Sequence, residues 1–190
     1  MSTSVKPGPR ERLLLAAQEL TYAQGVGVGV DALLKGAGVA RRSLYEHFGG
    51  KDGLIAEVLR RSTAEDVERY RATMDAAGGD PRARLLAVVD RLGQIVAAPD
   101  FHGCRYLAAD LALTDPEHPA HEVTSAYRRT LHGLFTDEFV ALGHARPDFA
   151  ADQLLLLVDG LLAAGATRPG SALAAAARDL AEYLIDAGRA

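Results

Sequence analysis

The chain has 190 residues, of which 48% are hydrophobic and 6% aromatic, with no tryptophan. This length suits one or two domains with a stable core, and a composition rich in Ala and Leu but poor in aromatics predicts an all-α fold. The single cysteine, Cys104, excludes an intrachain disulfide and fits a reducing, cytoplasmic location. The net charge of −4 would by itself argue against nucleic acid as a partner.

Charge is divided unequally along the chain, however. Residues 1–62 carry nine Lys and Arg against six Asp and Glu, whereas residues 63–190 carry twelve against nineteen. The first segment is therefore net basic and the second net acidic. That distribution is expected of a protein that meets DNA with one end only.

Neither a secretion signal nor a membrane span is expected. The N-terminal stretch MSTSVKPGPRER has no apolar core of the kind that a signal peptide needs. The most apolar run, residues 154–166, is too short to cross a bilayer and is interrupted by Asp159 and Gly160.

The chain begins with a polar segment, residues 1–9, that predicts a flexible tail. A first helix is expected from about Arg10 to Gln24, where apolar residues recur at helical spacing, and Gly25 supplies its C-terminal cap. The apolar stripe of this helix consists of Leu13, Ala16, Ala17 and Leu20.

A two-turn helix is predicted next, because Val30, Leu33 and Ala37 fall at i, i+3 and i+7. Gly38 then stands where the chain must turn sharply, since glycine takes a positive φ there without steric cost.

The helix that follows this turn, Arg41–Phe48, places Leu44 and Phe48 inward at i and i+4. It is too short to be stable alone in water, so it must dock on its neighbours. Its other faces carry long hydrogen-bond donors, which suit a helix entering the major groove of DNA. These donors are Arg41, Arg42, Tyr45 and His47.

Six further helices are predicted from apolar periodicity and from Gly and Pro boundaries, giving about nine in all. They span residues 51–77, 81–98, a short helix that opens within 101–107 and ends at 114, then 120–142, 148–167 and 171–187. Asp80 and Pro81 have the residue types of an N-cap and a first-turn proline.

The last two predicted helices carry apolar faces wider than one core requires, which indicates a partner surface. The candidate interface residues are Leu154, Leu155, Val158, Leu161, Leu162, Leu173, Ala177, Leu180 and Leu184.

The segment GAGVARRSLYEHFGGKDGL, preceded by RERLLLAAQELTYAQGV, resembles the N-terminal domain of TetR-type (TetR/AcrR-like) transcriptional regulators. The resemblance covers residues 10–60 and includes the AGV…LYxHF…K signature. It implies a three-helix helix-turn-helix DNA-binding domain over residues 10–55, with the motif at 30–49, and a ligand-binding and dimerisation domain over residues 56–190. It further implies a homodimer through the last two helices and a near-palindromic operator in double-stranded DNA.

The resemblance also assigns DNA contacts by position, to Ala40, Arg41, Arg42, Ser43, Tyr45, His47 and Lys51. This sequence departs from the family at Gly29 and Ala40, where Ser or Thr usually caps a helix and touches phosphate. It also departs at Arg42, where many relatives carry glycine. From the residues alone, a core aromatic is an alternative interpretation of Tyr45, and a cap interaction at the helix end is an alternative for His47.

A pocket for an unidentified small molecule is expected among the helices from Tyr70 to Phe139. Each candidate lining residue also fits an ordinary core position. The candidates are Tyr70, Leu92, Tyr106, Asp110, Tyr127, Leu131 and Phe135.

Other reactive residues are sparse. His118 and His121 have a spacing seen in metal sites, but Pro119 interrupts the helix between them. Cys104 with His102 could form a nucleophile and base, although a structural cysteine fits as well. No catalytic residue, metal site or cofactor is therefore predicted, and the protein is not expected to be an enzyme.

The leading hypothesis is a dimeric transcriptional regulator, acting as a repressor that a small-molecule ligand releases from its operator. A constitutive DNA-binding regulator without a ligand remains open. So does a helical enzyme or ligand carrier with a vestigial DNA-binding head.

Overall fold

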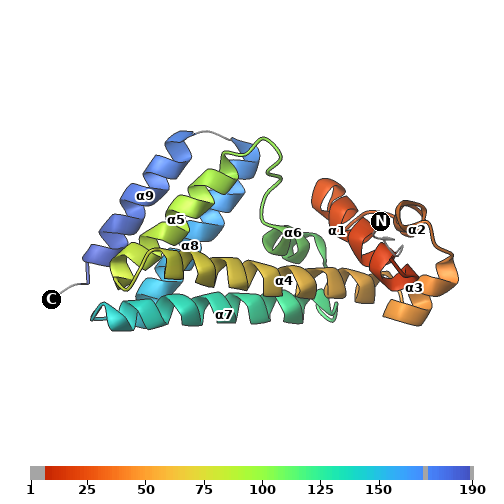
Figure 1. The fold of residues 1–190 in the computed structure, drawn as a ribbon, viewed down its shortest axis with the longest axis horizontal. Helices are drawn as coiled ribbons and strands as arrows, with labels where there is room; N and C mark the ends of the chain where they lie inside the picture. Colours follow the sequence, from red (N-terminus) through yellow and green to blue (C-terminus); the bar gives the residue numbers. More distant parts are fainter. Residues whose placement is uncertain (1–6, 169–170, 189–190) are drawn as a thin grey trace, which may run out of the picture. The chain divides into compact units, whose positions relative to one another are not determined.

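Nine α-helices and no strand make up residues 7–168 and 171–188, the part of the chain that the computed structural model describes (Figure 1). In chain order they are α1 (Pro9–Gln24), α2 (Val30–Ala37), α3 (Arg41–Phe48), α4 (Lys51–Ala76), α5 (Pro81–Val96), α6 (Arg105–Ala112), α7 (Ala120–Ala141), α8 (Pro147–Thr167) and α9 (Ser171–Asp186). The predicted all-α fold is confirmed. Of the expected tail, residues 1–6 lie outside the described residues, and Pro9 already opens α1.

The helices form two compact units, each built from two stretches of chain. The head unit runs to Thr63 and includes Arg105–Thr124, whereas the body unit holds Ala64–Cys104 and the chain from Ser125 onward. This division differs from the one expected between residues 55 and 56, because α6 and the start of α7 belong with the helix-turn-helix.

Arg105, the first residue of α6, explains why α6 belongs to the head unit. Its Nη1 donates a hydrogen bond of 2.9 Å to the Oγ of Ser62 in α4, and Ser62 is only 1% exposed. Its guanidinium also lies over the ring of Tyr22 in α1, 5.0 Å from the ring centroid, where the electron-rich face attracts a cation. One side chain thus ties α6 to both α1 and α4.

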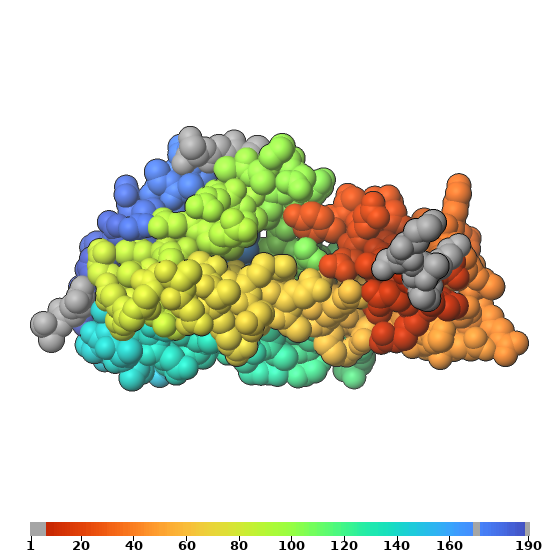
Figure 2. Space-filling model, in the orientation of Figure 1, coloured from red at the N-terminus to blue at the C-terminus, as the bar shows by residue number. Residues whose placement is uncertain are grey.

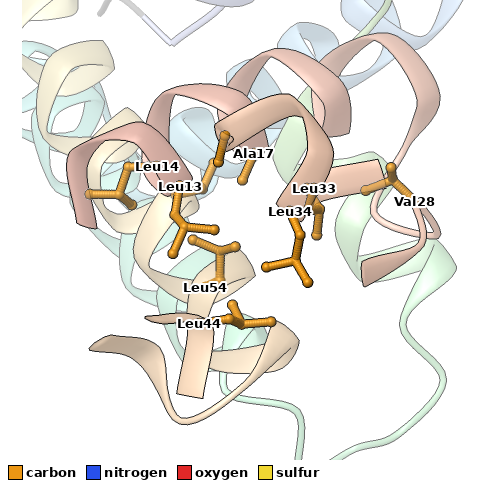
Figure 3. Close-up of a cluster of buried hydrophobic side chains, with 10 residues drawn as sticks. Leu13, Leu14, Ala17, Val28, Leu33, Leu34, Leu44 and Leu54 are labelled. Atoms are coloured by element: carbon orange, nitrogen blue, oxygen red, sulfur yellow. The ribbon is translucent and has the colours of Figure 1, made fainter. Parts of the chain in front are cut away.

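The core of the head unit is a cluster of leucines contributed by all four N-terminal helices (Figure 3). Leu13 of α1, Leu33 of α2, Leu44 of α3 and Leu54 of α4 each have no exposed surface. Figure 3 shows Leu13, Leu34, Leu44 and Leu54 pointing toward one another. The eight residues of α3 are therefore held by contacts with three other helices rather than by their own helical stability.

The ends of the helices follow from local residue chemistry. Gly38 ends α2 in the left-handed conformation predicted for it, with φ of 61°, and its N–H donates to the carbonyl of Lys35 at 3.2 Å. Asp80 is the predicted N-cap of α5, since its carboxylate accepts from the N–H groups of Arg82 and Ala83. Gly29 and Ala40 precede α2 and α3 without a side-chain cap, because neither residue has a side-chain oxygen that could accept a hydrogen bond.

In the body unit, α5, α8 and α9 pack on one another. The space-filling view shows α5 and the second half of α4 side by side on one face of this unit (Figure 2).

Two glycines of the body unit permit close approaches between helices. A Cβ at Gly93 of α5 would lie 2.8 Å from the Cβ of Ala174 in α9, and one at Gly165 of α8 would lie 2.6 Å from the Cβ of Val96 in α5. Larger residues at either position would force these helices apart.

One described helix, α8, is long and apolar enough to cross a membrane by length and composition alone, with a mean hydropathy of 1.5. Its inner stripe, which includes Leu154, Val158 and Leu161, is buried in the body unit, where α8 packs against α5 and α9. Much of its apolar character is therefore that of a core helix.

Replacing Leu44 by Ala is expected to lower the free energy of unfolding by about 2–5 kcal/mol, because it leaves a cavity where a fully buried side chain stood. Leu15→Ala is the control, since Leu15 is 45% exposed on α1 and its loss should cost less than about 1 kcal/mol. Urea denaturation followed by circular dichroism measures both. Equal losses would show that Leu44 is not the anchor of α3.

Candidate DNA interface

Helix α3 separates its residues cleanly into an inner and an outer side. Leu44 is fully buried and Phe48 half-buried, and Ser43 is half-buried at the edge. Arg41 and Tyr45 lie one turn apart on the solvent side, beside Arg42 and Glu46, which are also one turn apart. The outer side of α3 therefore consists of two adjacent rows of long polar side chains.

Both arginines of this outer side are paired with carboxylates in the free protein. An Nη2–Oδ1 contact of 2.6 Å joins Arg41 to Asp31 in the first turn of α2. The Nε of Arg42 donates to Oε1 of Glu46 within α3. Exposed ion pairs of this kind contribute about 0–1 kcal/mol, so both arginines can exchange their carboxylate for another anion.

Asp31 and Glu46 are not among the site residues predicted from the sequence. The i,i+4 spacing of Arg42 and Glu46 is a signal that the sequence carries. The pair between Arg41 and Asp31 spans two helices and has no such signal.

Tyr45 and His47 are both exposed, and Tyr45 has 56% of its surface accessible. The alternative interpretation of Tyr45 as a core aromatic is therefore wrong. The ring of His47 meets that of Phe48 edge-on, with centroids 6.3 Å apart. Ala40 is exposed just before α3, and Lys51 is half-buried as the first residue of α4.

Arg10 and Arg12 of α1 are used inside the head unit. Arg10 forms a 2.7 Å ion pair with Glu57 and lies 5.4 Å from the ring centroid of Phe48. The Nη1 of Arg12 donates to the carbonyl of Gly38 at 3.0 Å. Arg12 thus supports the turn that sets the direction of α3.

Comparison with known proteins identifies this arrangement of helices. The family described as "Bacterial regulatory proteins, tetR family" matches residues 13–58, the stretch that builds the outer side of α3 and its support. The crystal structure of a TetR transcriptional regulator from Streptomyces avermitilis is 39% identical, covers 96% of this chain and 98% of that one, and gives a TM-score of 0.87. The chain belongs to the TetR family.

Two curated relatives within this family match over shorter segments. The regulator BetI of Stenotrophomonas maltophilia is 38% identical over 90 residues, 45% of this chain and 44% of its own length. The repressor NemR of Escherichia coli is 29% identical over 106 residues, 55% of this chain and 53% of its own length. The match thus spans about half the length of these relatives. The TetR family is one of transcriptional regulators, not of enzymes.

The predicted pocket residues of this TetR-family chain fall into both units. Tyr106 and Asp110 lie in α6, in the head unit, whereas the other five belong to the body unit. The ring of Tyr70 meets that of Phe135 edge-on, with centroids 6.4 Å apart. Burial raises the pKa of the Tyr70 hydroxyl, while a hydrogen bond from Tyr127 acts in the opposite direction. The remaining two, Leu92 and Leu131, are buried.

Asp110 already has partners within the head unit. Its Oδ1 lies 3.0 Å from the Nδ1 of His121 and accepts a 2.7 Å hydrogen bond from the hydroxyl of Thr124, which is 1% exposed. The hydrogen bond with Asp110 is the main cause that raises the pKa of His121, against a smaller opposing effect of burial. Asp110 therefore joins α6 to the start of α7.

The predicted interface residues of α8 and α9 are divided between the core and the surface. Buried in the single chain are Leu154, Val158, Leu161, Leu162 and Ala177. Partly or largely accessible are Leu155, Leu173, Leu180 and Leu184. Leu156 and Tyr183 are 73% and 71% exposed on the same two helices and are not among the predicted interface residues.

The other reactive residues have structural partners. The Nδ1 of His118 accepts from the N–H of Ala120 at 3.1 Å and so caps α7, and its Nε2 lies 3.4 Å from Asp52. His102 contacts the carbonyl of Asp100 at 2.7 Å, and Cys104 is half-buried. Within the described ranges, no group of three or more side chains is arranged to hold a metal ion.

Stability should depend on pH through His121. Because its pKa is raised in the folded state, the pair with Asp110 stabilises fully below the unfolded-state pKa of about 6.5 and is lost as pH rises through the folded-state pKa. The difference in unfolding free energy between the wild type and His121→Asn should shrink as the pH rises from about 5.5 to about 9. Asp110→Asn should remove this pH dependence, and a difference constant with pH would contradict the assignment.

Proposed function

We propose that this TetR-family protein is a cytoplasmic, homodimeric, sequence-specific DNA-binding regulator, and most simply a repressor that a small molecule releases from its operator. The observation that carries the proposal is the two-sided build of α3, in which Leu44 is buried while Arg41, Arg42 and Tyr45 face solvent. A docked helix with long donors on its outer side is what the major groove accommodates.

The side chains around α3 divide between base edges and the DNA backbone. Arg41, Arg42 and Ser43, in the first turn, would reach base edges or adjacent phosphates, as the first residues of recognition helices do. Tyr45 and His47 would donate to phosphate oxygens. Lys51 opens α4, where an ammonium lies beside free N–H groups and favours a phosphate.

A homodimer through α8 and α9 is supported by the apolar surface that these helices leave uncovered. Leu156 and Tyr183 are largely exposed, and Leu180 is 48% exposed. Large apolar side chains left exposed on neighbouring helices are typical of a partner site, and a two-fold axis makes such a surface complementary to itself. Two copies of α3 about one DNA turn apart would then read a near-palindromic operator.

Release by a small molecule requires two conformations that the ligand distinguishes, with a coupling free energy of about 1–3 kcal/mol. The ligand would bind in the body unit, near the hydroxyls of Tyr70, which is half-buried, and Tyr127, which is buried. The name of NemR supports repression as the outcome.

A constitutive regulator without a ligand is the second candidate. It is favoured by Asp110, the charged member of the predicted pocket, which already contacts His121 and Thr124. Gel shifts with DNA from the neighbouring intergenic region distinguish the two, because only the first candidate predicts release by a metabolite. Thermal-shift screening against a metabolite library would supply the compounds to test.

Replacing both Arg42 and Tyr45 by Ala should abolish specific retention in such a gel shift, because the double variant removes a base-reading guanidinium and a phosphate donor. A loss of about 1–3 kcal/mol is expected for the guanidinium alone. Both side chains are exposed, so circular dichroism and gel filtration should match the wild type. Unchanged retention by the folded double variant would mean that α3 does not carry the DNA site.

Charges placed on the exposed surface of α8 and α9 should separate the subunits. Leu156→Glu with Tyr183→Glu is expected to convert the dimer to a monomer in light scattering, because each carboxylate would have to be buried at the interface. Val140→Glu is the matched control, since Val140 is 59% exposed on α7. A dimer that survives the double change places the interface elsewhere.

A further inference from the structure

The two guanidinium groups on the outer side of α3 are held in different ways. Arg42 is bound through Nε, the guanidinium nitrogen nearest the side-chain carbons, which donates to Oε1 of Glu46. Arg41 is bound through a terminal nitrogen, with Nη2 on Oδ1 of Asp31 at 2.6 Å. Which nitrogen a carboxylate occupies decides which nitrogens remain for DNA.

A carboxylate on Nε leaves the two terminal nitrogens of Arg42 available as a parallel pair of N–H donors. Guanine presents two acceptors, O6 and N7, on its major-groove edge, and a guanidinium can bind both at once. Glu46 therefore occupies the one nitrogen that this end-on geometry does not need.

The pair between Arg42 and Glu46 also restricts a flexible side chain. The Arg42 side chain is 87% exposed and contacts α3 through Glu46, one helical turn away. An arginine with several rotatable bonds loses less freedom on binding when one of its nitrogens is already fixed. A carboxylate close to DNA repels phosphates and so lowers the affinity for DNA. The position of Glu46 next to Arg42 is therefore unfavourable for binding unless Glu46 orients that arginine.

We propose that Glu46 is a positioning residue that directs the terminal nitrogens of Arg42 toward a guanine in each half of the operator. This inference rests on the proposed DNA-binding function. It means that the half-site contains a G·C pair whose recognition needs both residues, although only Arg42 touches the base.

Asp31 provides the matched contrast. Its side chain is 90% exposed, and it occupies a terminal nitrogen of Arg41 that a phosphate or base would otherwise bind. Asp31 therefore competes with DNA for Arg41, whereas Glu46 assists Arg42. Removing the two carboxylates should have opposite effects.

The experiment begins with selection of duplexes from a random library by the full-length wild-type protein, which gives a consensus half-site. Dissociation constants are then measured for the consensus duplex and for duplexes in which each G·C pair is replaced by A·T. The proteins compared are the wild type, Arg42→Ala, Glu46→Ala, Glu46→Gln and Asp31→Asn. All four changes lie at exposed positions, and thermal melting checks that each variant is folded.

We expect Arg42→Ala to lose the preference for one particular G·C pair. Glu46→Ala should reduce the preference at that same pair about 3–10-fold, a part of the discrimination that a guanidinium on guanine provides. Glu46→Gln should recover part of it, because the amide oxygen can still accept from Nε. Asp31→Asn should tighten binding to every duplex and leave the preference at the Arg42 pair unchanged.

Three results would overturn the inference. Glu46→Ala could tighten binding to all duplexes equally, which would make Glu46 a repelling charge only. It could leave the preference at the Arg42 pair intact, or change the preference at a pair that Arg42→Ala does not affect, which would mean that Glu46 contacts a base itself. A wild-type protein that enriches no sequence would instead refute the proposed function, and this inference with it.

Discussion

The burial of Leu44 is the constraint on which the rest of the head unit depends. An eight-residue helix has too few internal hydrogen bonds to be stable in water, so α3 exists because Leu44 packs between α1, α2 and α4. The burial of Leu44 also fixes the rotation of α3 about its axis. Because Leu44 points into the core, the solvent side of α3 carries Arg41, Arg42 and Tyr45.

Two arginines of α1 add contacts at the two ends of α3. Arg12 holds the carbonyl of Gly38 at the turn that precedes the helix, and Arg10 lies over Phe48 at its far end. Both cations thus support the ends of α3 from within the head unit. The two arginines on the outer side of α3, Arg41 and Arg42, are each paired with a carboxylate. The net charge of this surface is therefore lower than its arginine content suggests, which would limit binding of the proposed interface to arbitrary DNA.

The head unit is also larger than a helix-turn-helix. Arg105 ties α6 to Ser62 and to Tyr22, and Asp110 ties α6 to the start of α7. Both α4 and α7 contribute residues to each unit.

The sequence by itself determined which segments are helical and where they end, because those properties depend on neighbours in the chain. The turn at Gly38, the cap at Asp80 and the inward position of Leu44 follow from local sterics, hydrogen bonding and a 3.6-residue period. Only the tertiary structure decided which apolar helix face packs against which other helix. A wide stripe of leucines is equally suited to a core and to a partner, so Leu154 is buried while Leu156 is exposed for reasons set by α5 and α9. Pairs between distant residues, such as Arg41 with Asp31, likewise arise from the packing of whole helices, which no local pattern encodes.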